Sequence, residues 1–419
     1  MWHLCGFAMR QCLELGLHRP KPHGAYQARL EQQRRKLFWS VYIFERKSAL
    51  VLGRPFAVSD KDVDISMPDD DMQENGSLAD MSTTALHRHH ILLYRIHSKI
   101  RSTLHHLKRG ASNDKVHGKV NRCLEMLEEW KQNMLQEINS RVVDTNPAPS
   151  ATAPPQSDSS DSADDTPTPL ARSSNLDKAE LLLEYHKARR SLLQPLLTDC
   201  GPQHSPTLSD YTSCADASGQ ICQHYRLLHR LSALPFTLRD LHAVLVAGFT
   251  SLYCIAARPI LYNAQNAGAI GACSTVLYVI AEQWEGAKRY RDTFETVAER
   301  LVAMVNVASE SRNDPLGSNG GNLLAHVLRT QDQRQNPSHP VQPQSRRWSS
   351  TDADQPLQAG GQAASIRNTS HMVEGGDPDL PGIFGSIVED SFATFDVDYE
   401  EDGLRELLMN EGFDWFAKA

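Results

Sequence analysis

Apolar residues return every three or four positions along most of the chain, which predicts helices and not strands. One such face occupies residues 2–15, and a second runs from about Gln27 to Leu52. Charged residues stand between the apolar ones of the second segment, as in an amphipathic helix that buries its apolar side. The apolar positions expected to be buried are Leu30, Leu37, Phe38, Val41, Phe44, Ala49 and Leu52, and the charged positions between them are Glu31, Arg34, Arg35, Glu45 and Arg46.

Further helical patterns cover residues 82–110, 116–135, 176–196, 221–231, 237–257 and 276–305. Ser82 or Thr83 is suited to cap the first of them, and Thr237 opens the most apolar one. The last pattern is predicted to form one unbroken helix. Because no segment shows the alternation of a strand, the predicted fold class is all-α, a multi-helical domain in two packed lobes.

Two stretches interrupt the helical pattern. Residues 144–168 are mainly Pro, Ser, Thr, Ala and Asp without an aromatic residue, and Asn, Gln, Ser, Gly and Pro dominate residues 311–376. Such compositions cannot bury enough apolar surface to become ordered. The predicted organisation is a first helical lobe over 1–143, a linker over 144–173, a second lobe over 174–310, a disordered linker over 311–376 and an acidic–hydrophobic tail over 377–419.

Four short motifs follow one another in residues 15–68. They are Leu15-Gly16-Leu17-His18-Arg19, Arg34-Arg35-Lys36-Leu37-Phe38-Trp39-Ser40-Val41-Tyr42, Gly53-Arg54-Pro55 and the acidic segment from Asp62 to Pro68. Gly16 and Gly53 suit the left-handed position just past a helix end. Pro20 and Pro55 then prevent the helix from continuing. The motifs therefore describe a helix end, a long helix, a sharp stop and an acidic loop.

The order and spacing of these motifs resemble the fungal-specific transcription factor domain, the middle regulatory region of fungal zinc-cluster transcription factors. The residues that carry the resemblance are Gly16, Leu17, His18, Arg34, Arg35, Phe38, Trp39, Tyr42, Gly53, Arg54, Pro55, Asp62 and Pro68. Residues 185–190 are similar to the second helical portion of that family. The resemblance implies a nuclear protein that controls transcription by RNA polymerase II, responds to a small metabolite, and forms a homodimer or pairs with a related factor.

The resemblance also implies DNA contact through a zinc cluster upstream of this domain, and the chain lacks that cluster. Cys5 and Cys12 do not replace it, because a zinc site needs about four convergent ligands and no Cys-x-x-Cys accompanies them. They are interpreted as core residues, so no cofactor is expected in this chain. The abrupt start fits a truncated gene model as well as a natural short form.

Other clusters of polar residues have plainer interpretations than a site. The helical pattern places His90 on the apolar stripe and both His87 and His89 on the polar face. The acidic residues from Asp60 to Asp71 lack the glycine and glutamate of a calcium loop, and we expect them to pair with Arg54 or Arg34. No nucleophile elbow, phosphate-binding loop or dinucleotide fingerprint occurs, so nothing at residue level supports an enzyme.

The net charge of −8 is unevenly distributed. The tail from Asp377 holds twelve acidic residues against Arg405 and Lys418, which leaves the rest of the chain slightly positive. That surplus is too small for a nucleic-acid-binding domain. Eight cysteines without paired spacing indicate reduced thiols. The longest apolar run, 243–257, is shorter than the roughly 20 residues of a membrane span and predicts a buried helix.

The tail interleaves aromatic and acidic residues, which is typical of an acidic–hydrophobic activation segment. Carboxylates that repel one another oppose collapse and leave the apolar side chains available to a groove on the transcription machinery or a coactivator. The candidate contact residues are Leu404, Leu407, Leu408, Phe413, Trp415 and Phe416. The alternative is that the tail docks on the helical core and closes it.

The sequence thus predicts the regulatory domain of a fungal zinc-cluster-type transcription factor, and not an enzyme. A stand-alone helical interaction scaffold is the first alternative. An all-α enzyme with a pocket between the two lobes is the second, and a pocket with a strongly perturbed carboxylate or histidine pair would support it.

Overall fold

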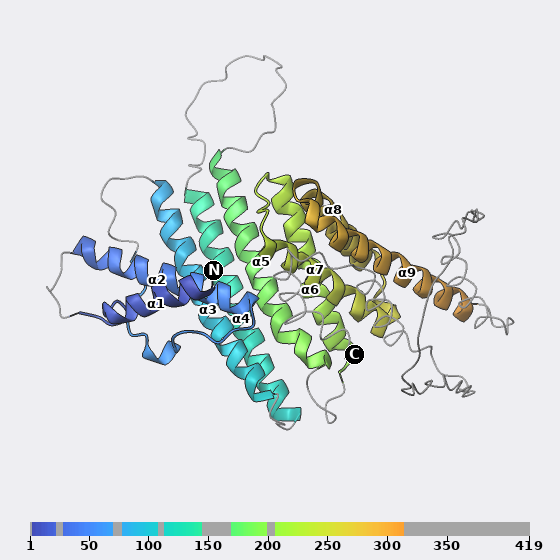
Figure 1. Ribbon diagram of the computed structural model, residues 1–419, viewed down its shortest axis with the longest axis horizontal. Helices are drawn as coiled ribbons and strands as arrows, with labels where there is room; N and C mark the ends of the chain where they lie inside the picture. The colour runs from blue at the N-terminus through green and yellow to red at the C-terminus, as the bar shows by residue number, and fades with distance from the viewer. Residues whose placement is uncertain are drawn as a thin grey trace, which may run out of the picture. The chain divides into compact units, whose positions relative to one another are not determined.

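The computed structural model describes residues 2–21, 28–69, 78–107, 113–144, 169–198 and 206–313 (Figure 1). These residues form α-helices and short 3₁₀ helices, and no strand occurs among them, so the predicted all-α class is confirmed. The α-helices are α1 Trp2–Glu14, α2 Ala28–Val51, α3 Leu78–Leu107, α4 Asn113–Asp144, α5 Pro169–Thr198, α6 Leu208–Arg230, α7 Leu238–Ala257, α8 Ala264–Gln283 and α9 Lys288–Asn313. The 3₁₀ helices are η1 Asp60–Asp62, η2 Pro259–Leu261 and η3 Glu285–Ala287.

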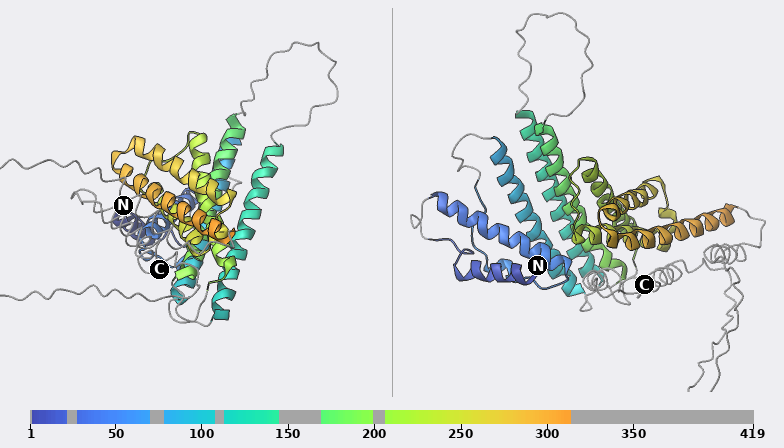
Figure 2. Two further views of the ribbon diagram at one scale, coloured as in Figure 1. Left: turned by 90° about the vertical axis from the view of Figure 1, so that its right-hand side faces the viewer. Right: turned by 45° about the horizontal axis from the view of Figure 1, so that its top comes forward.

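The described residues up to Val302 belong to one compact unit, and Ala303 begins a second unit of which the structure describes only the end of α9. Within the first unit, α3, α4 and α5 run side by side, with α1 and α2 on one side of them and α6 to α8 on the other (Figures 1 and 2). Helix α5 packs against α3 and α4 and also against α6 and α7. The division into two lobes at the 144–173 linker remains a prediction.

Helix α7 is the most deeply buried helix of the group α6 to α8. The side chain of Thr237 accepts a hydrogen bond from the backbone N–H of Asp240 and caps it, as predicted. Seventeen of its 20 residues are buried, which confirms the predicted core helix. Helices α7 and α8 are both long and apolar enough to cross a membrane, but 94% of the apolar window of α7 is buried inside the protein.

The predicted unbroken helix over 276–305 is wrong. Helix α8 ends at Gln283, η3 follows, and α9 begins at Lys288. Trp284 has extended dihedral angles, and its N–H donates to the carbonyl of Ile280 as a helix cap. The break turns the chain so that apolar residues of both α8 and α9 are buried.

Other helices also begin earlier than the apolar pattern indicated, and α6 already begins at Leu208 and not near residue 221. Helix α3 begins at Leu78, so neither Ser82 nor Thr83 caps it. Helix α5 begins at Pro169 and includes residues assigned to the linker. Proline is favoured in the first turn of a helix, where its missing N–H has no intrahelical partner to lose.

Candidate functional site

The four motifs of residues 15–68 come together around α2. Cys5 Sγ of α1 lies 3.4 Å from Ser48 Oγ, and Arg34 Nη2 donates to the carbonyl of Gly16 at 3.3 Å. These contacts place α1 antiparallel to α2. Gly16 and Gly53 have φ angles of 64° and 61°, as predicted for residues past a helix end.

The acidic segment packs on the turn after α1 and on α2. The carbonyl of His18 accepts hydrogen bonds from the backbone N–H groups of Asp64 and Ile65, both at 3.0 Å. Trp39 Nε1 donates to the carbonyl of Ser66 at 2.9 Å. The residues of this apolar core are Met9, Cys12, Leu17, Phe38, Trp39, Tyr42, Ile43, Val58, Val63, Ile65, Ile91 and Tyr94.

Arg46 is fully buried at the centre of a charged network between α2 and residues 58–60, which lead into the acidic segment. Its Nη1 donates to Glu45 at 2.7 Å, and its Nη2 donates to Asp60 and to the carbonyl of Val58, both at 2.8 Å. Tyr42 also donates to Asp60, at 2.6 Å, and burial raises the pKa of Tyr42 to about 12. The network satisfies charges that would otherwise be costly to bury.

Two carboxylates of this region have partners other than Arg54 and Arg34. Asp60 pairs with Arg46, and Asp69 pairs with Arg35 at 2.5 Å. Arg34 forms an ion pair with Glu31 in its own helix, and the pairing of the acidic residues with Arg54 or Arg34 stays a prediction.

The buried face of α2 also differs from the predicted one. Glu45 and Arg46 are buried, whereas Leu30, Leu37 and Phe44 are exposed. The residues that face the chain between Ala57 and Ser66 are Phe38, Trp39, Tyr42, Glu45 and Arg46. Because this face carries both the aromatic residues and the charged network, the apolar stripe of Leu30, Leu37 and Phe44 is turned away from it.

The remaining motif residues differ in their burial. Leu17, His18 and Pro68 are buried, whereas Pro55 and Asp62 are exposed. Arg54 is also exposed, and its guanidinium lies 5.8 Å from the Trp2 ring. The structure therefore unites these motifs as a scaffold that holds the acidic segment on α1 and α2.

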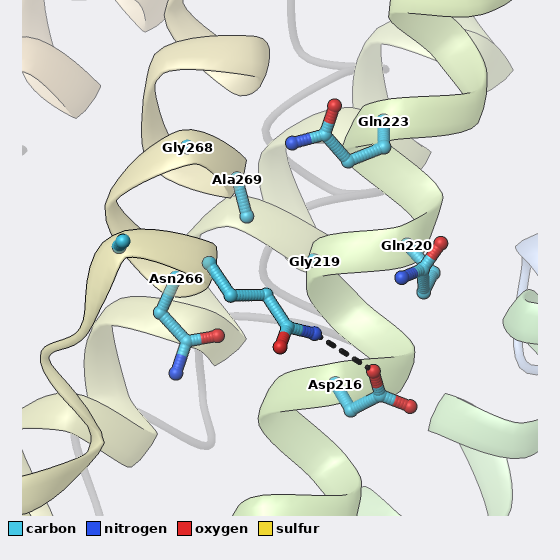
Figure 3. Close-up of a pocket in the computed structure, with 9 residues that line it drawn as sticks. Asp216, Gly219, Gln220, Gln223, Asn266, Gly268 and Ala269 are labelled. Atoms are coloured by element: carbon cyan, nitrogen blue, oxygen red, sulfur yellow. Dashed lines mark hydrogen bonds between the residues drawn. The ribbon is translucent and has the colours of Figure 1, made fainter.

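A polar pocket of about 280 Å³ lies between α6 and α8 (Figure 3). Asp216 closes one end, where it accepts hydrogen bonds from Gln265 at 3.3 Å and Arg189 at 2.8 Å. The two helices approach closely, because a Cβ on Gly219 would lie 3.0 Å from the Cβ of Ala269. The lining residues are Asp216, Gly219, Gln220, Gln223, Ala264, Gln265, Asn266, Gly268 and Ala269. No motif of the sequence pointed to this pocket.

A larger groove of about 480 Å³ lies between α3, α4 and η1. Its lining residues are Asp60, His89, Leu92, Arg95, Ile96, Lys99, Met126, Glu129, Trp130 and Asn133. The groove combines apolar side chains with two cations, Arg95 and Lys99, and two carboxylates, Asp60 and Glu129, so it suits a small molecule that is partly apolar and carries balanced polar groups. Asp60 links it to the charged network around Arg46.

Comparison with known proteins identifies the N-terminal part of the chain. Residues 1–143 match the family model described as the fungal specific transcription factor domain. These residues form a fungal specific transcription factor domain. The resemblance seen in the motifs is thereby confirmed, and the domain contains the whole motif cluster and the α3/α4 groove.

Curated relatives of the chain are fungal transcriptional regulators. The uncharacterized transcriptional regulatory protein YLR278C of Saccharomyces cerevisiae is 24% identical over 64% of the chain and 19% of its own length. The transcriptional activator protein acu-15 of Neurospora crassa is 25% identical over 59% and 25%, respectively. The negative regulator of pleiotropic drug resistance STB5 of Candida glabrata is 44% identical over 16% and 7%. The matches thus span a quarter or less of these proteins, and no solved structure matches the chain.

A polar cluster lies inside the protein where α3, α5, α6 and α7 pack, partly beyond the transcription factor domain. Tyr94 donates to Glu184 at 2.8 Å, and Lys187 Nζ lies 3.0 Å from the same carboxylate. Burial raises the pKa of Glu184, but Lys187, Lys47 and the Tyr94 hydrogen bond together hold it well below its usual range. Burial lowers the pKa of His97, which stacks on Tyr94, to about 4.

These perturbed groups do not line either pocket described above. A pocket with a strongly perturbed carboxylate or histidine pair would have supported an enzyme. These groups do not supply such a pair to the α6/α8 pocket or to the α3/α4 groove.

His89 has other surroundings than the helical pattern predicted, and the tail residues lie outside the described residues. His89 is buried, and not on a polar face: its Nε2 lies 2.8 Å from Glu137, and Trp130 Nε1 donates to its carbonyl at 3.0 Å. Cys12 is a core residue, as predicted. The candidate activation residues Leu404, Leu407, Leu408, Phe413, Trp415 and Phe416 lie outside the described residues, as do 145–168 and 314–376.

Proposed function

We propose that the chain is the regulatory part of a fungal zinc-cluster-type transcription factor, which acts in the nucleus on transcription by RNA polymerase II. The observation that carries this proposal is the convergence of the four motifs around α2 within the matched domain. The relatives named as transcriptional regulators support it.

In this proposal the motif cluster is a scaffold, and protein contacts are made elsewhere. The network around Arg46 and the hydrogen bond from Trp39 hold the acidic segment on α2. We assign contact with coactivators or the transcription machinery to the tail over 377–419, because it combines dense acidic charge with aromatic residues.

The α3/α4 groove is our candidate for the response to a small metabolite. Its volume of about 480 Å³ falls within the range typical of small-molecule sites. Arg95 and Lys99 are matched by Asp60 and Glu129, which favours a neutral or zwitterionic ligand, and Leu92 with Met126 favours an apolar portion. Because Asp60 lines the groove and also binds Arg46, a ligand there would act on the acidic segment.

A reporter assay tests the proposed function. The full chain is fused to a heterologous DNA-binding domain, and transcription is compared with that from the same fusion carrying Phe413→Ala, Trp415→Ala and Phe416→Ala. We expect activation by the first fusion and its loss in the second. Trp348→Ala is the matched control, since it removes an aromatic residue from the 311–376 linker. A silent fusion that is expressed and folded would contradict the proposal.

A further inference from the structure

Helices α6, α7 and α8 bury four cysteines, which the fold arranges as two thiol pairs. The thiols of Cys214 in α6 and Cys254 in α7 share a hydrogen bond, and so do those of Cys222 in α6 and Cys273 in α8. All four side chains are at most 1% exposed. The members of each pair are far apart in sequence, so the spacing of the cysteines predicted neither pair.

The packing of α6 on α7 brings the first pair together. Tyr211 lies one helical turn before the first cysteine of α6, and its ring centroid is 6.4 Å from that of Tyr253 in α7. Tyr253 directly precedes the cysteine of α7. Further along α6, Tyr225 donates a hydrogen bond to Asp240 at 2.8 Å. These two contacts make α6 and α7 antiparallel, in the register that places the two thiols side by side.

A close approach of α6 to α8 brings the second pair together. A Cβ on Gly219 would lie 3.0 Å from the Cβ of Ala269. Cys222 lies one helical turn after Gly219, on the same side of α6. Cys273 likewise lies one turn after Ala269, and its Sγ is 3.7 Å from the carbonyl oxygen of Val244 in α7. A disulfide requires Cα atoms within about 7 Å of each other, which two helices reach only where they pack this closely.

The cysteines of α1 and α4 have different neighbours. Cys5 Sγ lies 3.4 Å from Ser48 Oγ, and Cys123 Sγ lies 3.7 Å from Thr103 Oγ1. Cys12 belongs to the apolar core around α2. A thiol beside a hydroxyl cannot close to a disulfide within the fold, so these cysteines are internal controls for the two pairs.

We propose that the two thiol pairs are oxidation sites, which close to disulfides when a hydroperoxide such as hydrogen peroxide reaches them. The peroxide oxidises one thiol to a sulfenic acid, its O–O bond breaks, and one water molecule is released. The partner thiol then attacks that sulfur, the S–S bond forms, and a second water molecule leaves. Because the fold already holds the two sulfurs in contact, the partner thiol reacts before a second peroxide molecule does.

Burial determines how readily the pairs react. It raises the pKa of Cys254 and Cys273 well above the usual range, so these thiols are protonated and poorly nucleophilic at neutral pH. The α6/α8 pocket gives a small oxidant an approach, because its lining residues Gly219 and Gln223 come from the same part of α6 as Cys222. We therefore expect a response to sustained peroxide and not to a brief pulse.

This inference goes beyond the proposed function, since it concerns the packing of α6 to α8 and neither the motif cluster nor the tail. The two disulfides would tie α6 to both α7 and α8. Each would also restrict the unfolded chain, so the oxidised protein should be more stable than the reduced one.

Thiol counting tests the proposal without a reporter. The full chain carries Cys200→Ser, which removes the cysteine outside the described residues and leaves seven. The folded, reduced protein is treated with hydrogen peroxide, then unfolded in N-ethylmaleimide and weighed by mass spectrometry. We expect the four paired cysteines to escape labelling. Full labelling of all seven after the treatment, or sulfinic acids in place of disulfides, would overturn the proposal.

Single substitutions assign the partners. Cys254→Ala should leave Cys214 open to the label, while Cys222 and Cys273 still escape it. Cys123→Ala is the matched control, because it removes a buried thiol whose neighbour is a hydroxyl, and all four paired cysteines should still escape. Equal numbers of protected cysteines in the two variants would overturn the assignment of the pairs.

Thermal melting shows whether the disulfides form within the native fold. The oxidised chain should melt at least about 5 °C above the reduced chain, and dithiothreitol should reverse the difference. Cys222→Ala removes one of the two disulfides and should reduce the difference. A melting temperature lowered by oxidation would mean that the disulfides distort the packing of α6 to α8, and the proposal would fail.

Discussion

Trp39 of α2 donates a hydrogen bond from its indole Nε1 to the carbonyl oxygen of Ser66, 2.9 Å away. The same indole packs against the rings of Phe38 and Tyr42, with centroids 5.3 and 5.0 Å apart. The motif helix thus holds the acidic segment both by packing and by a directed polar contact.

Replacing Trp39 should separate these two contributions. Trp39→Ala should lower the free energy of unfolding by about 3–5 kcal/mol, because it opens a cavity in the core. Trp39→Phe keeps much of the packing and leaves the Ser66 carbonyl without its donor, which should cost about 1–3 kcal/mol. Urea denaturation measures both values. Ile260→Ala, at a position 74% exposed, is the control and should change little. Equal stability of the Trp39→Ala variant and the wild type would contradict the placement.

Removing Arg46 should destabilise the domain strongly. Arg46→Ala leaves the carboxylates of Glu45 and Asp60 without their cation in a buried site, which should cost about 3–5 kcal/mol. Denaturation by urea measures the loss. Lys288→Ala is a matched control, because Lys288 and Glu285 form an ion pair of the same 2.7 Å length on the surface, and its removal should leave stability unchanged. Similar effects of the two substitutions would show that burial of the Arg46 network is unimportant.

Acid should destabilise the protein between pH 6.5 and 4. Burial lowers the pKa of His90, His97 and His242 to about 4 in the folded chain. Between pH 6.5 and 4 the unfolded chain therefore binds more protons than the folded chain. The contribution of these histidines to the free energy of unfolding is complete above pH 6.5 and is lost as the pH falls towards 4. Each histidine contributes on the order of 3 kcal/mol.

The variant His97→Phe checks this origin, because it removes one titrating group from a ring stack with Tyr94. Urea denaturation at pH 7, 5.5 and 4.5 should show a smaller loss of stability for this variant than for the wild type. His229→Phe, at an exposed position of α6, should keep the wild-type loss. An unaltered pH dependence in His97→Phe would assign the acid sensitivity to other groups.

Two glycine substitutions should have opposite effects. A Cβ on Gly248 of α7 would lie 2.5 Å from Cys273 Sγ and 2.6 Å from Phe294 Cε2, so Gly248→Ala should cost about 1–3 kcal/mol. Gly271 of α8 has nothing within 4 Å of such a Cβ, and Gly271→Ala should stabilise the helix by up to about 1 kcal/mol. Thermal melting ranks the variants, and a stable Gly248→Ala would show that α7, α8 and α9 can move apart cheaply.

Limited proteolysis tests the predicted linker. Its Pro, Ser, Thr and Asp composition predicts that the first cuts fall within 145–168. The two fragments should stay together on a gel-filtration column, because α5 packs on α3 and α4 across the cut. Tyr185 donates to Glu128 at 2.9 Å, and Tyr94 to Glu184 at 2.8 Å. A first cut inside α4 or α5 would move the boundary, and separation of the fragments would contradict the packing.

Local chemistry made several features of this protein predictable from sequence. The all-α class follows from a period of three to four residues, which a helix imposes on any segment that buries one side. Gly16, Gly53 and the Thr237 cap act within one turn of the chain, so their roles need no distant partner. The resemblance to the fungal specific transcription factor domain rested on motifs contiguous in sequence, and it is confirmed over residues 1–143.

Tertiary contacts decided what the local pattern left undetermined. Helix α2 carries two apolar stripes, and only its packing against the acidic segment selects Phe38, Trp39 and Tyr42 for the core. The same packing buries the Arg46 network, since Asp60 and the Val58 carbonyl supply partners from beyond the helix. Exposure of Leu37 and Phe44 follows from that choice. The helical period fixes the sequence spacing of residues that share one side of a helix, but only the neighbouring elements determine which side is buried.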